Sequence, residues 1–140
     1  ISHNIYVSVL GDTIARDYGS ISGCTVDEAV ELRQAGIEKP ILILGYTFPE
    51  CYTHIVKHEI HQTIFSLDMA KALSREAVRQ NKKAYVHIKL DTGMGRIGYQ
   101  TAKEAAEEVE KISKLPMLVT NGYKDFCYHH MTYLLLTSLS

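Results

Sequence analysis

The chain has 140 residues, 46% of them hydrophobic, and a formal net charge of −1 at pH 7, which is the composition of one ordinary globular domain able to bury a core. The balanced charge and the lack of a Lys/Arg block argue against nucleic acid or an anionic membrane surface as partners. The three cysteines, Cys24, Cys51 and Cys127, form no C-x-x-C pair, which argues against a zinc or redox motif and favours a reducing, cytoplasmic location.

Neither end of the chain carries a membrane signal. Ile1 to Leu10 lacks a basic leader before an apolar run, so we do not expect it to be a signal peptide. Tyr133 to Leu139 is apolar but far shorter than the roughly 20 residues that a membrane helix needs. We therefore expect no membrane contact from this segment.

The first elements can be assigned from caps and apolar runs. Residues 5–18 are compatible with a helix, and residues 20–24 with a short strand. Thr25 and Glu28 have the spacing of a capping box, and Gly36 can supply a left-handed stop, so a helix is expected between Thr25 and Gly36.

An unbroken apolar run follows over 41–44, bounded by Pro40 and Gly45, and predicts a strand covered on both faces. Pro49 suits the first turn of a helix that runs to about His58.

The second half continues the same alternation. Residues 63–65 predict a short strand, and Ser66 can cap a helix over 67–81. A strand over 86–91 follows, in which apolar and ionisable side chains alternate. Thr101 and Glu104 repeat the capping-box spacing and predict a helix that ends before Pro116.

This rhythm of strands and helices predicts an α/β fold with parallel βαβ units. A partial TIM-type (β/α)8 barrel and a doubly wound sheet would both satisfy it. In a barrel, the inner face of a strand can carry polar groups near its carboxyl end, where active sites lie. His87, Lys89 and Asp91 suit that position. No repeat or low-complexity linker indicates a second domain within these residues.

The loop after this strand is rich in glycine, which lets the main chain turn sharply and approach a ligand. Arg96 stands among Gly93, Gly95 and Gly98, and its guanidinium could hold a carboxylate or phosphate through two hydrogen bonds. The glycines also spell G-x-G-x-x-G, which leaves a nucleotide-binding βαβ protein as an alternative. In that motif the helix opens within the glycines, whereas the best helix start here is Thr101.

The run KLDTGMGRIG at 89–98 resembles the signature of alanine racemases, the pyridoxal-phosphate enzymes that interconvert L- and D-alanine. The segments VDEAVELRQAGI at 26–37 and PILILGYT at 40–47 support the resemblance. It extends from about Val26 to Pro116 and includes the related serine/alanine racemases. Residues 117–140 diverge from the family pattern.

This resemblance implies a TIM-type barrel, pyridoxal 5'-phosphate as cofactor and an isomerase that supplies D-alanine for peptidoglycan precursors. Arg96 matches the family arginine that binds the substrate carboxylate and the cofactor's phenolic oxygen. Lys89 matches the lysine that many members carry as a carbamate, which orients the arginine. The substrate would be alanine or serine, and the full-length protein a homodimer.

The family's Schiff-base lysine falls, by counting back along the chain, at or just before Ile1, and Ser2-His3-Asn4 is a possible remnant of its segment. The later strands and the β-rich second domain have no match. We therefore expect residues 1–140 to be a fragment of the barrel domain, inactive alone, from a truncated gene, a reading-frame error or a degenerate paralogue. No residue is assigned a catalytic role.

Three plainer interpretations stay open. Arg96 could be a solvated loop charge, and Lys89 could pair with Asp91 inside the barrel. The whole chain could also be a noncatalytic barrel or interaction module that kept the racemase sequence. His54, His58 and His61 have a spacing that could place them on one helical face as metal ligands, but a solvated basic face is the favoured interpretation and no metal site is assigned.

Overall fold

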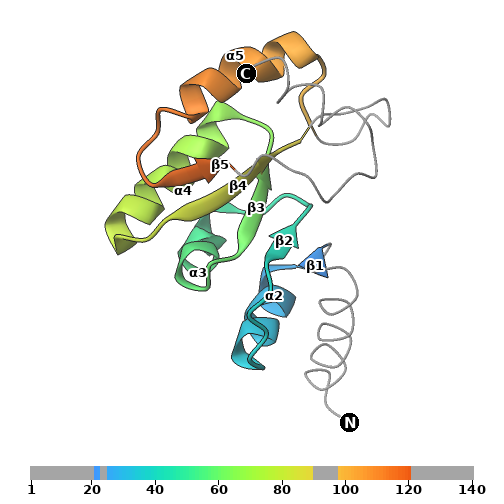
Figure 1. Ribbon diagram of the computed structural model, residues 1–140, viewed down its shortest axis with the longest axis vertical. Helices are drawn as coiled ribbons and strands as arrows, with labels where there is room; N and C mark the ends of the chain where they lie inside the picture. The colour runs from blue at the N-terminus through green and yellow to red at the C-terminus, as the bar shows by residue number, and fades with distance from the viewer. Residues whose placement is uncertain (1–20, 23–24, 90–97, 121–140) are drawn as a thin grey trace.

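The computed structural model describes residues 21–22, 25–89 and 98–120 (Figure 1). In chain order the elements are β1 (Ile21–Ser22), α2 (Val26–Gln34), β2 (Ile41–Ile43), the 3-10 helix η1 (Pro49–Cys51), α3 (Tyr52–Lys57), β3 (His61–Ile64), α4 (Leu67–Gln80), β4 (Ala84–Ile88), α5 (Ala102–Ile112) and β5 (Leu118–Thr120). The helix expected over residues 5–18 lies outside the described residues.

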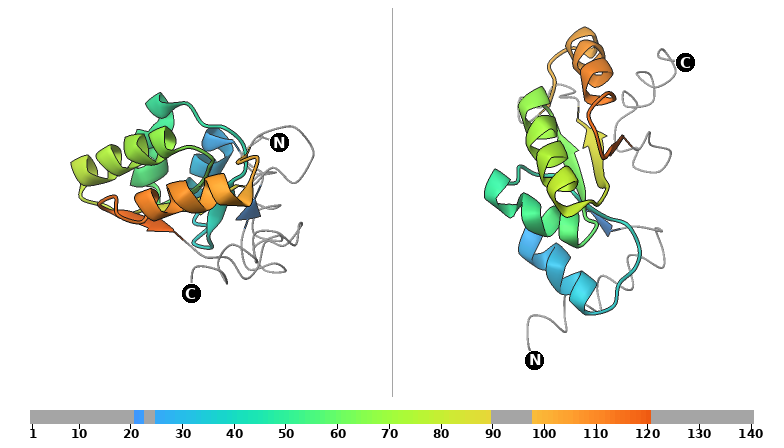
Figure 2. Two further views of the ribbon diagram at one scale, coloured as in Figure 1. Left: turned by 90° about the horizontal axis from the view of Figure 1, so that it is seen from above. Right: turned by 90° about the vertical axis from the view of Figure 1, so that its left-hand side faces the viewer.

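The strands form one parallel sheet whose spatial order, β1-β2-β3-β4-β5, follows the chain. Helices α2 to α5 form an outer layer on one face of this sheet (Figure 2). A doubly wound sheet reverses its strand order at a switch point and carries helices on both faces. The described part of the chain does neither, so the doubly wound alternative is wrong and the arrangement is an arc of a barrel.

Each predicted helix cap is present. The Thr25 hydroxyl accepts the Glu28 N–H at 3.3 Å while the Glu28 carboxylate accepts the Thr25 N–H at 2.8 Å, which completes the capping box. Ser66 Oγ accepts the Met69 N–H at 3.2 Å at the start of α4. Thr101 caps α5 in the same way. These side chains satisfy amides that a helix start leaves without partners.

The core lies between the sheet and the helices. Alternate strand residues point into it, and their buried members are Ile41, Ile43, Ile64, Ala84 and Val86. Buried residues of the helices meet them, including Ala29, Leu32, Ile55, Ala70, Leu73, Ala77 and Ile112. Because strand side chains alternate between faces, the residues between these positions face the opposite side of the sheet.

The strands differ from the sequence expectation in their bounds, and one strand was not expected. Strand β3 begins at His61, whereas the sequence predicted a start at Thr63. Its first two residues, His61 and Gln62, are polar, so the apolar pattern did not reveal them as strand residues. Strand β4 begins at Ala84, whereas the sequence predicted a start at Val86. Strand β5 was not expected at all. It has three residues directly after the turn at Met117, and it is defined by its pairing with β4, where Ala84 lies opposite Leu118.

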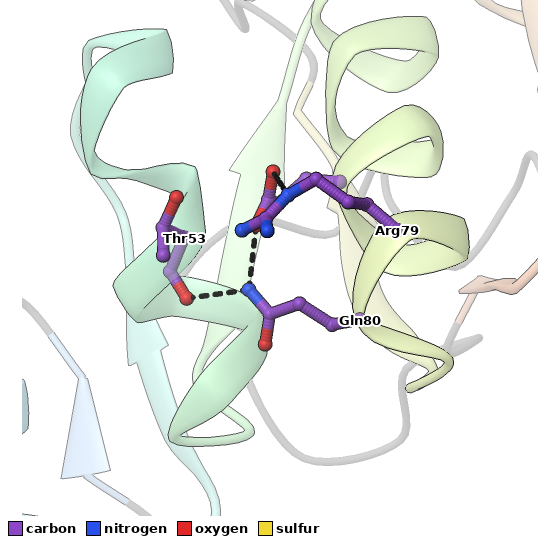
Figure 3. A network of polar contacts seen from close by, with 4 residues as sticks. Thr53, Arg79 and Gln80 are labelled. Carbon is purple, nitrogen blue, oxygen red and sulfur yellow. Dashed lines mark hydrogen bonds and ion pairs between the residues drawn. The ribbon is translucent and has the colours of Figure 1, made fainter.

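The outer layer is also held by polar contacts between α3 and α4 (Figure 3). The Gln80 amide donates to the Thr53 carbonyl oxygen at 2.9 Å and to the Glu76 carboxylate at 2.6 Å. Arg79 also donates to Glu76, at 3.0 Å from Nε, and this hydrogen bond lowers the pKa of the Glu76 carboxyl. The C-terminal turn of α4 is thereby tied to the middle of α3.

Arg33 joins α2 to the turn after α3. Its guanidinium donates to the carbonyl oxygens of His58 at 2.8 Å, Ile37 at 2.7 Å, Lys39 at 2.8 Å and Glu59 at 3.1 Å. These contacts satisfy carbonyl groups on both sides of β2. A planar guanidinium with several fixed donors can serve such a set, whereas a lysine ammonium presents one compact charge.

We expect Arg33→Lys to lower the free energy of unfolding by about 1 to 3 kcal/mol, because several part-buried carbonyls lose their donor. Urea unfolding followed by circular dichroism measures the change. The control is Arg75→Lys on the exposed side of α4, which should change stability by less than about 0.5 kcal/mol. Equal effects of the two substitutions would contradict the role given to Arg33.

Candidate functional site

The face of the sheet that points away from the helices carries the polar residues, and we call it the inner face. Thr63 lies opposite His87 in the pairing of β3 with β4, and both are out of phase with the core residues of their strands. By the same alternation His61, Tyr85 and Lys89 belong to this face. The sequence had placed His87 and Lys89 together on one face; Asp91 lies outside the described residues.

A histidine pair occupies the middle of the inner face. His61 Nδ1 lies 3.0 Å from His87 Nε2, and the His61 ring stacks on Tyr85 with centroids 4.9 Å apart. His87 is 9% exposed. One nitrogen of the pair must donate and the other accept. The two rings therefore link β3 to β4 through one shared proton.

Burial keeps both imidazoles neutral. It lowers the pKa of His87 to about 4, with a further contribution from His61, and it lowers the pKa of His61, with a contribution from Arg33. The cause is the cost of placing an imidazolium away from water. The alternation of residues along β4 predicts an ionisable face, whereas burial holds His87 in its uncharged form within the sheet.

Lys89 stands at the carboxyl end of β4. Its N–H donates to the Ile64 carbonyl oxygen at 3.0 Å, which continues the pairing with β3. Its ammonium reaches across β3 to the Leu44 carbonyl oxygen after β2, at a long 3.4 Å. Of the lysines in the described ranges, Lys89 alone is half-buried, and the others are exposed. Lys89 is thus a partly covered lysine at the carboxyl end of the sheet, which we call the mouth of the barrel arc.

The residues on either side of the glycine-rich segment are joined at this same point. The Tyr99 N–H donates to the Lys89 carbonyl oxygen at 2.9 Å. Gly98, just before it, has φ of 143°, a conformation that other residues rarely adopt. Arg96, Gly93 and Gly95 lie outside the described residues.

Sequence reasoning missed a buried amide that shapes the mouth. Gln62 is 0% exposed. Its Nε2 donates to the Gly45 carbonyl oxygen at 2.9 Å, and its Oε1 accepts the Thr47 hydroxyl at 2.7 Å. The loop after β2 is thereby fixed against β3. The available signal was a single glutamine next to the strand predicted over 63–65, since a buried amide must find partners.

Aromatic rings lie exposed beyond the same strands. Tyr46 is 47% exposed and Phe48 66% exposed. Their rings meet edge to face with centroids 5.2 Å apart, and the Tyr46 ring also lies 6.2 Å from that of Phe65 after β3. We call these three residues the aromatic rim. Exposed apolar groups gathered in this way are typical of surfaces that another molecule or chain segment covers.

The structure argues against the histidine metal site. His54 and His58 stack at the end of α3, with centroids 6.4 Å apart, but His61 belongs to β3 and turns to His87. Within the described ranges, no three His, Cys, Asp or Glu side chains converge as metal ligands.

The nucleotide-binding alternative is also wrong. Helix α5 begins at Ala102 after the Thr101 cap, four residues beyond Gly98. A dinucleotide motif needs the helix amides among its glycines to meet the phosphates.

The described residues contain no helix long and apolar enough to cross a bilayer.

Pyridoxal phosphate needs a lysine for covalent attachment and donors for its phosphate. In the part of the chain that the structure describes, the only half-buried lysine, Lys89, already contacts a main-chain carbonyl. Neighbouring Leu44 and Phe65 offer apolar surface. These residues fit one flank of such a site, but they provide neither the covalent anchor nor a phosphate cradle.

A parallel strand order that follows the chain, one outer layer of helices and polar groups at the carboxyl end define part of a (β/α) barrel enzyme domain. Residues 13–127 match the family model of the alanine racemase N-terminal domain. The chain belongs to the alanine racemase family, whose members depend on pyridoxal phosphate.

Individual relatives agree with this membership. The alanine racemase of Clostridium novyi is 46% identical over 103 residues, which cover 74% of this chain and 27% of that protein. Alanine racemase 1 of Clostridium acetobutylicum is 50% identical over 97 residues, covering 69% of this chain and 25% of that protein. The chain therefore spans about a quarter of the length of these curated relatives.

Solved structures share the fold. An alanine racemase from Clostridium difficile superimposes with a TM-score of 0.77 and 34% identity, over 82% of this chain and 30% of that one. A histidine racemase from Leuconostoc mesenteroides, 16% identical, reaches a TM-score of 0.65 over 96% of this chain and 46% of its own. This second likeness shows the fold alone.

Because His87 is buried in its neutral form, we expect the free energy of unfolding to fall as the pH is lowered. The unfolded His87 imidazole takes up a proton below about pH 6.5, whereas the folded one does so only near pH 4. Stability from this group is therefore complete above pH 6.5 and is lost as the pH falls toward 4. The loss is at most about 3.4 kcal/mol, for a shift of about 2.5 pKa units at 1.36 kcal/mol per unit.

Urea unfolding between pH 7.5 and about 4 measures this slope. His87→Gln, which offers an amide nitrogen near the position of Nε2, should flatten it. His54→Gln on the exposed side of α3 is the control and should retain it. An unchanged slope in His87→Gln would contradict the assignment to this pair.

Proposed function

We propose that residues 1–140 are a fragment of the pyridoxal-phosphate barrel domain of an alanine racemase, with a family-like core over about 26–116 and a divergent tail over 117–140. The complete enzyme would interconvert L- and D-alanine and so supply peptidoglycan precursors. The observation that carries the proposal is the KLDTGMGRIG run, at 89–98, on a barrel arc with Lys89 at the carboxyl-end mouth.

In this proposal Arg96 binds the substrate carboxylate and the phenolic oxygen of the cofactor. A guanidinium suits both partners because it presents parallel N–H donors and keeps its charge. Arg96 lies in the chain between Lys89 and Tyr99. The Tyr99 N–H donates to the Lys89 carbonyl oxygen at the carboxyl end of β4, which supports a role for Arg96 at that end.

Lys89 orients Arg96 after conversion to a carbamate. The ammonium first gives up one proton, and the neutral amine then adds to carbon dioxide. An N–C bond forms, one C=O π bond of carbon dioxide becomes a carboxylate, and a second proton leaves the nitrogen to solvent, so a cation becomes an anion. Two observations support this role: the Lys89 side chain is half-buried, and within the described part of the chain its Nζ contacts only the Leu44 carbonyl oxygen, at 3.4 Å. A carbamate at this place could accept hydrogen bonds from a guanidinium.

The cofactor, when bound, would stabilise the carbanion left by removal of the substrate's α-proton. The family's Schiff-base lysine, which would hold the cofactor, has no match among residues 1–140. The aromatic rim, in which Tyr46 and Phe48 are exposed and Phe65 is half-buried, supports a cover from elsewhere in the full-length protein, which we propose to be a cytoplasmic homodimer.

The 140-residue chain alone should not racemise alanine or serine. Incubation with pyridoxal phosphate should produce no imine absorption band that borohydride reduction removes. A band that survives Arg96→Ala but disappears when an internal lysine is replaced would contradict the proposal that the Schiff-base lysine is missing from residues 1–140.

A chimera tests the function of the part that is present. Residues 26–116 would replace the matching segment of the Clostridium novyi enzyme, and growth of a D-alanine-requiring bacterium would report activity. The chimera should restore growth. Arg96→Lys should reduce kcat/KM about 100-fold, equivalent to about 3 kcal/mol of lost transition-state binding.

Arg75→Lys in the same chimera is the matched control and should leave kcat/KM within about twofold of the parent, because Arg75 is exposed on α4. A chimera that folds but neither binds pyridoxal phosphate nor responds to Arg96→Lys would favour a noncatalytic module instead.

A further inference from the structure

Glu108 in the middle of α5 makes a contact that its neighbours do not. Its Oε2 accepts the Leu67 N–H at the start of α4, at 2.9 Å, and also accepts the Tyr99 phenol. One half-buried carboxylate oxygen thus joins two helices to the segment that leads back from the glycine-rich loop. Charge-assisted hydrogen bonds of this kind are about twice as strong as neutral ones.

Tyr99 is 4% exposed. Burial raises the pKa of its phenol, and the hydrogen bond to Glu108 raises it further. The phenol therefore remains a proton donor at neutral pH, and its carboxylate partner compensates it for the loss of water. The side chain of Tyr99 is fixed to the outer helical layer.

The main chain of Tyr99 is fixed to the sheet. Its N–H donates to the Lys89 carbonyl oxygen at 2.9 Å, while the Lys89 N–H donates to Ile64 at 3.0 Å. Both peptide groups of Lys89 are consequently held, one by β3 and one by Tyr99. With its main chain held in this way, the Lys89 ammonium varies its position only through its own side-chain torsions.

A purely local role does not account for this set of contacts. A helix start needs only an acceptor for its first N–H groups, and a water molecule or a cap could serve Leu67. The additional bond to Tyr99 extends the link from the helices to the lysine on the inner face. The other glutamates of α5, Glu104, Glu107 and Glu110, are exposed and make no such link.

We propose that Glu108 is a positioning residue for the site: through the Tyr99 phenol it holds the main chain at Lys89, and so sets where the Lys89 side chain lies at the barrel mouth. The functional part of this inference rests on the role of Lys89 under the proposed function. The mechanical part, from Glu108 to Lys89, stands on the hydrogen bonds alone.

Tyr99→Phe removes the phenol and keeps the ring, and Glu108→Ala removes the acceptor. Glu107→Ala, one residue away and exposed, is the matched control. Hydrogen exchange of the residue 99 amide, followed by NMR on the 140-residue chain, reports the bond to Lys89. Exchange should accelerate at least tenfold in both variants, with no comparable change at Val86 in β4 and none in the control.

The second measurement is the 13Cε chemical shift of Lys89, assigned by comparison with Lys89→Arg. A structural role for Glu108 that ends at the helices would leave this signal unmoved. We expect it to shift in Tyr99→Phe and in Glu108→Ala, and the double variant to shift no further than Glu108→Ala, because the two residues act in series.

An unchanged residue 99 amide in either variant, or an unmoved Lys89 signal beside an accelerated amide, would overturn the proposal. A separate sample with 13C-bicarbonate tests the proposed function: a carbamate carbonyl signal that Lys89→Arg abolishes supports it. If no carbamate forms while the amide and the 13Cε signal respond as expected, the role of Lys89 fails and the positioning by Glu108 stands.

Discussion

The parallel pairing of β3 with β4 is the constraint on which the site depends. The register that sets Thr63 opposite His87 continues to the bond between Lys89 and Ile64, so the lysine emerges at the carboxyl end in a fixed phase. A slip of one residue would turn every side chain of β4 to the other face. His87 would then enter the apolar core, and Lys89 would point toward the helices.

Much of the fold could be predicted because its signals are local. The Thr25, Ser66 and Thr101 caps each lie within three residues of the amide that they satisfy, so the sequence contains both partners. The polar start of β3 and the whole of β5 could not be predicted in the same way. His61 and Leu118 are strand residues because of pairing with neighbours distant in the chain, which short-range patterns do not encode.

In the candidate site, too, some residues could be found from the sequence and others only from contacts between distant segments. The resemblance of the run at 89–98 to the family signature nominated Lys89 and Arg96, and the structure describes the first of them at the carboxyl end of the sheet. Gln62, Tyr99 and Glu108 act through contacts between separate elements. A glutamate on a charged helix reads as solvated from the sequence, since its two donors come from other segments.

The strand order has a consequence for how this piece of a barrel can form. Since every strand pairs with the strand next in sequence, each βαβ unit can close as soon as its second strand has left the ribosome, without waiting for the remainder. Such nearest-neighbour connectivity keeps the chain separation between paired strands smaller than it would be in a sheet whose strand order departs from the chain. Growth of the sheet from the first strand onward would then follow the direction of synthesis.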